Sequence, residues 1–122
     1  MIIARKWKKG DLKRTFLLSE NTVTVSSAGK TAENEEFNVN YTVGYSAVEK
    51  KVFSGKNKTT FVIGKRERRT DVYNSNRCQL VASLEDVRDL NLVQVSDECF
   101  VIVDNGVDRF IYDEVGNLID CD

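Results

Sequence analysis

The residues best suited to chemistry are basic side chains, which form two groups in the first half of the chain. The first group surrounds Trp7, and the second follows the apolar run that ends at Ile63. Basic side chains attract phosphates, and an aromatic ring among them can stack on a nucleobase. The candidate ligand-binding or nucleic-acid-binding residues are Arg5, Lys6, Trp7, Lys8, Lys9, Lys13, Arg14, Lys65, Arg66, Arg68 and Arg69.

The charges divide along the chain, although the whole sequence has a net charge of −1. Residues 1–70 hold 15 Lys or Arg and 7 Asp or Glu, a net charge of +8. Residues 71–122 hold 3 and 12, a net charge of −9. Complementary charged surfaces steer protein association and set its orientation. We therefore expect a non-enzymatic binding module that docks to a protein partner through segregated basic and acidic surfaces.

An alternative function is the binding of nucleic acid or a phosphorylated ligand by the basic half. The sequence pI of about 5.6 weighs against it, because nucleic-acid-binding domains usually have a strongly basic balance. A plainer interpretation is that the charges lie on solvated faces, or pair with the acidic half within the fold or across a dimer. Long alternating strands also leave edges that pairing between copies would protect, so a homo-oligomer is compatible with the sequence.

Catalysis lacks its usual residues, because the chain contains no histidine. Histidine is the common general base at neutral pH and the commonest zinc ligand. An enzyme that uses lysine, tyrosine and carboxylates is the third functional class. The acidic residues near the C-terminal turns lack the ordered spacing of a calcium loop, and Asp104 and Asp113 are better explained as turn formers. The sequence therefore predicts no catalytic residue, no metal site and no cofactor.

The three cysteines, Cys78, Cys99 and Cys121, are an odd number at wide spacing. They fit neither a disulfide framework nor a paired metal site, which predicts reduced thiols in the cytoplasm. We expect Cys99 to pack in the core and Cys78, beside Arg77, to have a lowered thiol pKa. No apolar run approaches the roughly 20 residues that span a bilayer, and the N-terminus is charged too early for a signal peptide, so no membrane partner is expected.

Alternation of apolar and polar residues indicates strands. Between Phe37 and Ala47 every second residue is apolar or aromatic, which is typical of a long strand with one buried face. Gly44 within this run predicts a bend. Phe37, Tyr41 and Tyr45 share one face, where they line a ligand groove or, in the plainer interpretation, pack in the core.

Short polar connections join the remaining predicted strands. Hairpins are predicted over residues 15–25 and 51–63, and an exposed loop is predicted over residues 26–36. The last third reads as a meander of three strands, in which Asn105–Gly106 provides the positive φ angles of a tight primed turn.

One segment, Ser83–Leu90, predicts a helix of about two turns. A serine N-cap precedes acidic residues, and three apolar residues follow at a spacing of three. At 122 residues, with 41% hydrophobic and 30% charged residues, the chain has the size and composition of one globular domain. We expect a single domain over residues 1–122, an antiparallel β-sandwich or partly open β-barrel of roughly eight to eleven strands, with this short helix and the C-terminal β-meander.

Overall fold

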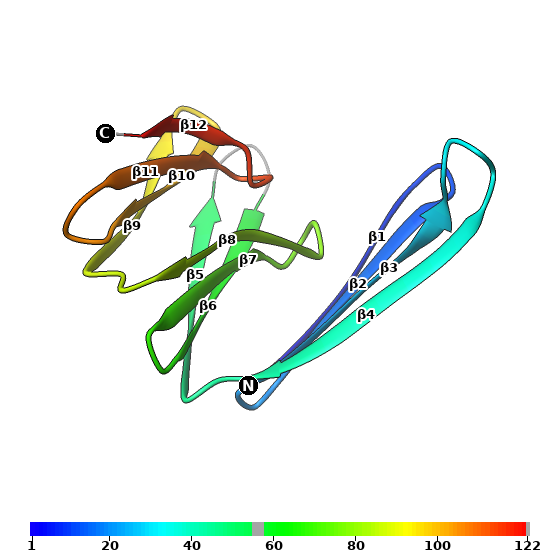
Figure 1. The fold of residues 1–122 in the computed structure, drawn as a ribbon, viewed down its shortest axis with the longest axis horizontal. Coiled ribbons are helices and arrows are strands. Elements are labelled where there is room, and N and C mark those ends of the chain that lie inside the picture. Colours follow the sequence, from blue (N-terminus) through cyan, green and yellow to red (C-terminus); the bar gives the residue numbers. More distant parts are fainter. Residues whose placement is uncertain (55–57, 122) are drawn as a thin grey trace.

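The computed structural model describes residues 1–54 and 58–121, which form twelve antiparallel strands and no helix. The strands follow one another as three four-stranded meanders, which we call sheet A (β1–β4), sheet B (β5–β8) and sheet C (β9–β12) (Figure 1). The predicted mainly β, antiparallel fold is therefore confirmed. The strand bounds are β1 (Ile2–Lys9), β2 (Leu12–Ser19), β3 (Thr22–Lys30), β4 (Glu36–Gly44), β5 (Ala47–Ser54), β6 (Lys58–Arg66), β7 (Arg69–Asn74), β8 (Gln79–Glu85), β9 (Asp89–Val95), β10 (Glu98–Asp104), β11 (Arg109–Asp113) and β12 (Leu118–Cys121).

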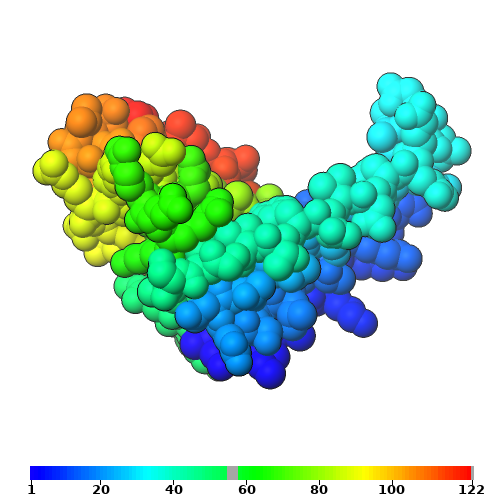
Figure 2. All heavy atoms as spheres, turned by 60° about the horizontal axis from the view of Figure 1, so that its bottom comes forward, coloured from blue at the N-terminus to red at the C-terminus, as the bar shows by residue number. Residues whose placement is uncertain are grey.

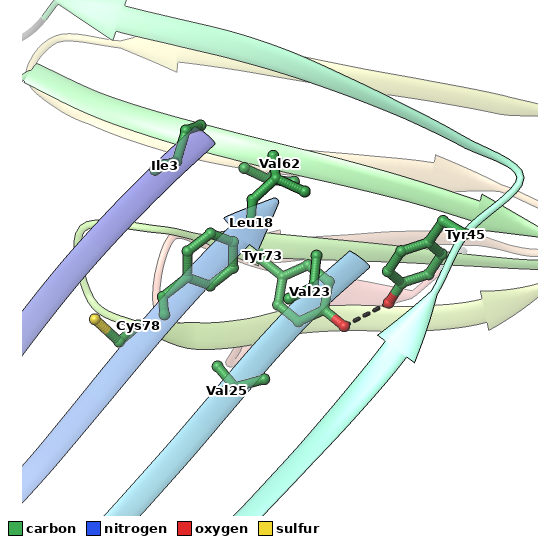
Figure 3. Packing of buried hydrophobic residues seen from close by; sticks show 9 residues of the cluster. Ile3, Leu18, Val23, Val25, Tyr45, Val62, Tyr73 and Cys78 are labelled. Carbon is green, nitrogen blue, oxygen red and sulfur yellow. Dashed lines mark hydrogen bonds between the residues drawn. The ribbon is translucent and has the colours of Figure 1, made fainter. Parts of the chain in front are cut away.

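The sheets pack face to face as three layers, with sheet B in the middle. One apolar cluster joins sheets A and B and includes Leu18 from β2, Val62 from β6 and Tyr73 from β7 (Figure 3). A second cluster joins sheets B and C and includes Phe61 and Val101. The described residues thus form three layers, whereas a β-sandwich has two. Among these residues, none of the three sheets closes into a barrel.

Sheet A extends beyond the part of it that packs on sheet B. The end of sheet A near Ile3, Leu18 and Val23 lies in the cluster with sheet B. The other end, with the turns after β1 and β3, projects away from the other two sheets (Figure 1). We call this projecting part, residues 5–14 and 26–41, the arm. The space-filling view shows a hollow between the arm and the rest of the molecule (Figure 2).

The predicted helix at Ser83–Leu90 is wrong. The segment instead ends β8, turns, and begins β9. The turn forms at Asp86, which has a φ of 55° and whose N–H donates to the carbonyl of Arg68 at 2.8 Å. The three apolar side chains of the segment all pack against the cluster between sheets B and C. Their spacing therefore suits a strand, turn and strand that cross one core as well as it suits a helix.

Two strand boundaries also differ from the sequence prediction. The run from Phe37 to Ala47 is not one bent strand, because the chain leaves sheet A after Gly44 and enters sheet B. The glycine marks the correct place, but the deviation is a change of sheet. The loop predicted over residues 26–36 begins only after Lys30, because β3 pairs with β4 along its whole length.

The predicted hairpins form, with one change in a turn. Glu20, with a φ of 55°, and Asn21 connect β2 to β3, and β5 pairs with β6, although residues 55–57 of their connection lie outside the described residues. In the C-terminal meander, Asn105–Gly106 belongs to a four-residue loop over 105–108 rather than to a two-residue turn. The side chain of Asn105 accepts two backbone N–H groups of this loop, which stabilises the wider form.

Candidate functional site

Strand alternation distributes the first basic group over both faces of sheet A. The register of β1 with β2 shows which residues share a side with the buried Ile3 and Phe16. The side that faces sheet B carries Arg5, Trp7, Lys9 and Arg14. The opposite, outer side carries Lys6, Lys8 and Lys13. What the sequence presents as one basic surface is therefore two surfaces.

Trp7 is covered by two arginines of the same chain. The guanidinium carbon of Arg14 lies 4.2 Å from the centroid of the indole ring, and that of Arg77 lies 5.6 Å from it. Arg14 also donates from Nη1 to Oε1 of Gln79 at 3.4 Å. These contacts hold the indole of the arm against the β7–β8 turn, and they reduce the ring area that is open to a nucleobase.

The arm and the β7–β8 region enclose a cleft. A pocket of about 180 Å³ is lined by Val39 and Tyr41 of the arm and by Leu80 of β8. These three side chains leave 60%, 41% and 37% of their surface exposed, although they are large and apolar or aromatic. We call this site the arm cleft and define it by Trp7, Arg14, Val39, Tyr41, Arg77, Gln79 and Leu80.

The arginines of the arm cleft have no carboxylate partner in the described part of the chain. Neither Arg14 nor Arg77 forms an ion pair with a described residue. The Nε of Arg77 is buried and has no hydrogen-bond partner among the described residues. A buried donor without an acceptor costs about 1–3 kcal/mol. The cleft thus combines exposed apolar side chains with guanidinium groups that no described carboxylate neutralises.

Cys78 lies at the floor of the cleft and is not an activated thiol. Burial raises the pKa of this thiol, and the nearby charges of Arg14 and Arg5 lower it by less. The predicted lowering of the Cys78 pKa is therefore wrong. Cys99 is buried in the cluster between sheets B and C, which confirms its predicted place in the core. Among the described residues Cys78 and Cys99 are buried, and Cys121 is exposed.

The second basic group lies on the β6–β7 turn and is partly neutralised. Arg68 donates from Nε and Nη2 to the carboxylate of Asp86, at 2.8 and 2.5 Å, and holds the pKa of that carboxyl below its usual value. Arg69 donates to Glu85 at 3.1 Å. Pairing of basic with acidic residues was one of the interpretations of the sequence. The other two members of the group, Lys65 and Arg66, are exposed.

The two basic groups do not meet to form one site. The second group occupies the turn before β7, whereas Arg77, which contacts Trp7, occupies the turn after β7. The two turns therefore lie at opposite ends of this strand. A single ligand on the arm cleft would reach Arg14 and Arg77, and the β6–β7 turn would remain outside its footprint.

A buried network of tyrosines and an aspartate lies beside the cleft. Tyr45 donates from Oη to Asp71 at 2.6 Å and forms a second hydrogen bond with Tyr73 (Figure 3). Asp71 also accepts from Ser83. Burial raises the pKa of both Tyr45 and Tyr73 above the ordinary 10.0, so both phenols stay protonated at neutral pH. The two tyrosines that the sequence places on one strand face thus separate, with Tyr45 in the core and Tyr41 in the cleft wall.

The acidic residues near the C-terminal turns shape the backbone. Asp104 accepts the N–H of Gly106 at 2.7 Å, and Asp113 accepts the N–H groups of Val115 and Asn117 at 3.1 and 2.8 Å. Their predicted role as turn formers is confirmed. Across residues 1–54 and 58–121, no three Asp, Glu or Cys side chains are grouped so that they could hold a metal ion.

Comparison with known proteins gives no relative. The sequence matches no known protein family, and neither a curated protein nor a solved structure is detectably similar to the chain. In the part of the chain that the structure describes, no helix has the length and apolar character needed to cross a membrane.

Sequence reasoning misses part of the cleft wall. Arg77 comes close to Trp7, and Gln79 and Leu80 come close to Arg14 and Val39, only through the packing of sheet A on sheet B, which no spacing in the sequence indicates. Val39 carries a usable signal, because it lies in the alternating run that also contains Tyr41. The alternation shows that Val39 and Tyr41 share one face of the strand, but it does not show that this face stays exposed.

Proposed function

We propose that this chain is a non-enzymatic, cytoplasmic module that binds a protein partner, and that the arm cleft receives an extended segment of that partner. The observation that carries the proposal is the exposure of Val39, Tyr41 and Leu80 beside Arg14 and Arg77. Exposed apolar patches mark interaction sites, and aromatic and arginine side chains are enriched at the centres of protein interfaces. The complementary segment carries carboxylates among apolar side chains.

A nucleic acid matches this cleft less well than a protein segment does. Arg14 covers part of the Trp7 indole, which reduces its value as a stacking platform. Arg68 and Arg69 of the second basic group already bind carboxylates of the same chain. The experiment therefore includes an oligonucleotide, and its binding is the outcome that would favour a nucleic-acid function.

Fluorescence anisotropy with three labelled probes tests the proposal. The probes are a short peptide of alternating aspartate and phenylalanine, the same peptide with lysine in place of aspartate, and a single-stranded oligonucleotide. In about 50 mM salt we expect the acidic peptide to bind and the basic peptide to bind weakly or not at all. Arg14→Gln should lower the affinity for the acidic peptide about tenfold, which corresponds to about 1.4 kcal/mol of binding free energy.

Arg66→Gln is the matched control, because it removes the same charge from the exposed β6–β7 turn, outside the cleft. It should leave the affinity for the acidic peptide unchanged. If neither peptide binds, or if Arg66→Gln weakens the acidic peptide as much as Arg14→Gln does, the arm cleft is not the docking site. Oligonucleotide binding with a steep salt dependence, together with failure of both peptides, would favour the nucleic-acid function instead.

A further inference from the structure

The two ends of the three-layer stack carry opposite charges. The outer face of sheet A, which points away from sheet B, holds these charged side chains: Lys6, Lys8, Lys13, Lys30 and Glu36, a net charge of +3. The outer face of sheet C holds Asp89, Glu98, Asp104, Asp113, Asp120 and Arg109, a net charge of −4. The charge division of the sequence thus becomes a division between two faces that sheet B separates.

Both outer faces also carry apolar side chains. On sheet C the register places Phe100 beside Val93 and Ile102 beside Ile111, and Val93 is 36% exposed. On sheet A, Leu17 is 42% exposed. Among the described residues, no fourth layer covers either face. In stacks of repeated units, an end unit without a partner usually has a polar outer face. The outer faces of sheets A and C are each polar only in part.

We propose that copies of this chain associate head to tail, with the outer face of sheet C on one copy packed against the outer face of sheet A on the next. Charge selects this pairing, because a net −4 then meets a net +3, whereas two like faces repel. One chain cannot bring its own two faces together, because sheet B lies between them. The contact is therefore heterologous, and it builds a closed ring or an open row of copies.

The expected contact is modest in strength. Sheet C has strands of at most seven residues, so its face measures about 23 Å along the strands and about 19 Å across the four of them. Each contact thus covers roughly 400 Å² per copy, or roughly 800 Å² in total, below the 1,200–2,000 Å² of a typical stable pair. We therefore expect association at protein concentrations of about 10–500 μM and at low salt, where charged surfaces attract most.

Mixing two charge-reversed variants in sedimentation velocity tests the proposal. The face A variant is Lys6→Glu with Lys8→Glu, and the face C variant is Glu98→Lys with Asp120→Lys. All four positions are exposed, so both variants should fold, which circular dichroism checks. We expect the wild-type chain to associate as concentration rises, and each variant alone to associate at least tenfold more weakly. Their equimolar mixture should form pairs and nothing larger, because it offers only one intact contact.

Several results would overturn head-to-tail association. A wild-type chain that stays monomeric at about 500 μM in low salt excludes it. A face A variant that associates like the wild type shows that like faces pair, and a folded but monomeric mixture shows that the two faces do not meet. The inference does not rest on the arm cleft. Arg14→Gln should lose peptide binding and keep self-association, so failure of either proposal is recognised separately.

Discussion

Sheet B and the arm of sheet A are both built from antiparallel hairpins, but the side chains of β6 and β7 in sheet B are mostly buried and those of the arm are largely exposed. In β6 the consecutive residues Phe61, Val62 and Ile63 are 0%, 0% and 1% exposed, because layers cover both faces of the sheet. In the arm, Val39 lies on the side of sheet A that faces sheet B and is still 60% exposed, because it borders the open arm cleft and not the packed core. Stability is therefore concentrated in the middle sheet, and the arm holds a surface that folding does not use.

Truncation of the middle sheet should have the largest effect. Phe61→Ala removes a fully buried ring from the cluster between sheets B and C, and we expect it to lower the free energy of unfolding by about 3–5 kcal/mol. Val39→Ala in the arm should change it by about 0.5 kcal/mol or less. Urea unfolding measures both. Similar losses for the two variants would show that the arm contributes to the core after all.

A glycine of β6 gives the next largest effect. A Cβ at Gly64 would lie 2.7 Å from ring carbons of Tyr45, which is buried and bonded to Asp71. The ring cannot move away without losing this bond, so Gly64→Ala should destabilise the fold by about 1–3 kcal/mol. Gly44→Ala is the control, because a Cβ there meets nothing within 4 Å. Equal melting temperatures for the two variants would contradict the tight packing of Tyr45.

The tyrosine network should make the fold sensitive to alkali. Because burial raises the pKa of Tyr45 in the folded state, the unfolded chain releases this proton first, near the ordinary 10.0. Its contribution to stability is therefore complete below pH 10 and falls as pH rises above it. Tyr45→Phe should lower stability at neutral pH by about 1–3 kcal/mol, because Asp71 loses a donor. Above pH 10 the unfolding free energy of the variant should also fall less steeply with pH than that of the wild type, by about 1.4 kcal/mol per pH unit.

The paired arginines of sheet B should give the smallest effect. Arg68→Gln removes the guanidinium that lowers the pKa of Asp86, so this pKa should return toward its ordinary value. Carboxyl titration by NMR measures the change. The lowered pKa of Asp86 stabilises the fold only at pH values above the titration range of this carboxyl. Any loss of stability caused by Arg68→Gln should therefore vanish as the pH falls through that range. An unchanged pKa of Asp86 would show that the β6–β7 turn is not neutralised by this pair.

Local sequence patterns predict the strands and hairpins but not how the layers meet. The β2–β3 hairpin follows from two β-rich runs around a short polar connection, and Asp113 forms the turn that its position suggests. The helix predicted at Ser83–Leu90 fails because residues three apart can also reach one core across a strand, a turn and a strand. The strand predicted over Phe37–Ala47 fails because alternation continues when the chain passes from one sheet to the next.

The candidate site shows the same limit. Local charge density predicts two similar basic groups, yet Arg68 and Arg69 find acidic partners close by, whereas Arg14 finds an indole and no described carboxylate. The approach of Arg77 to Trp7 depends on the angle between sheets A and B, which no short pattern in the sequence encodes. Charge counts therefore identify the basic half of the chain but not the part of it that is available to a partner.

The emission of Trp7 tests most directly whether the arm cleft receives a protein segment, because it is the only tryptophan of the chain and contacts Arg14, which lines the cleft. Titration with the peptide of alternating aspartate and phenylalanine should change this emission saturably, with the same dissociation constant as the anisotropy of the labelled peptide. Arg14→Gln should require about tenfold more peptide, and Arg66→Gln should behave like the wild type. Anisotropy that reports binding while the Trp7 emission stays constant would place the peptide elsewhere and contradict the proposed site.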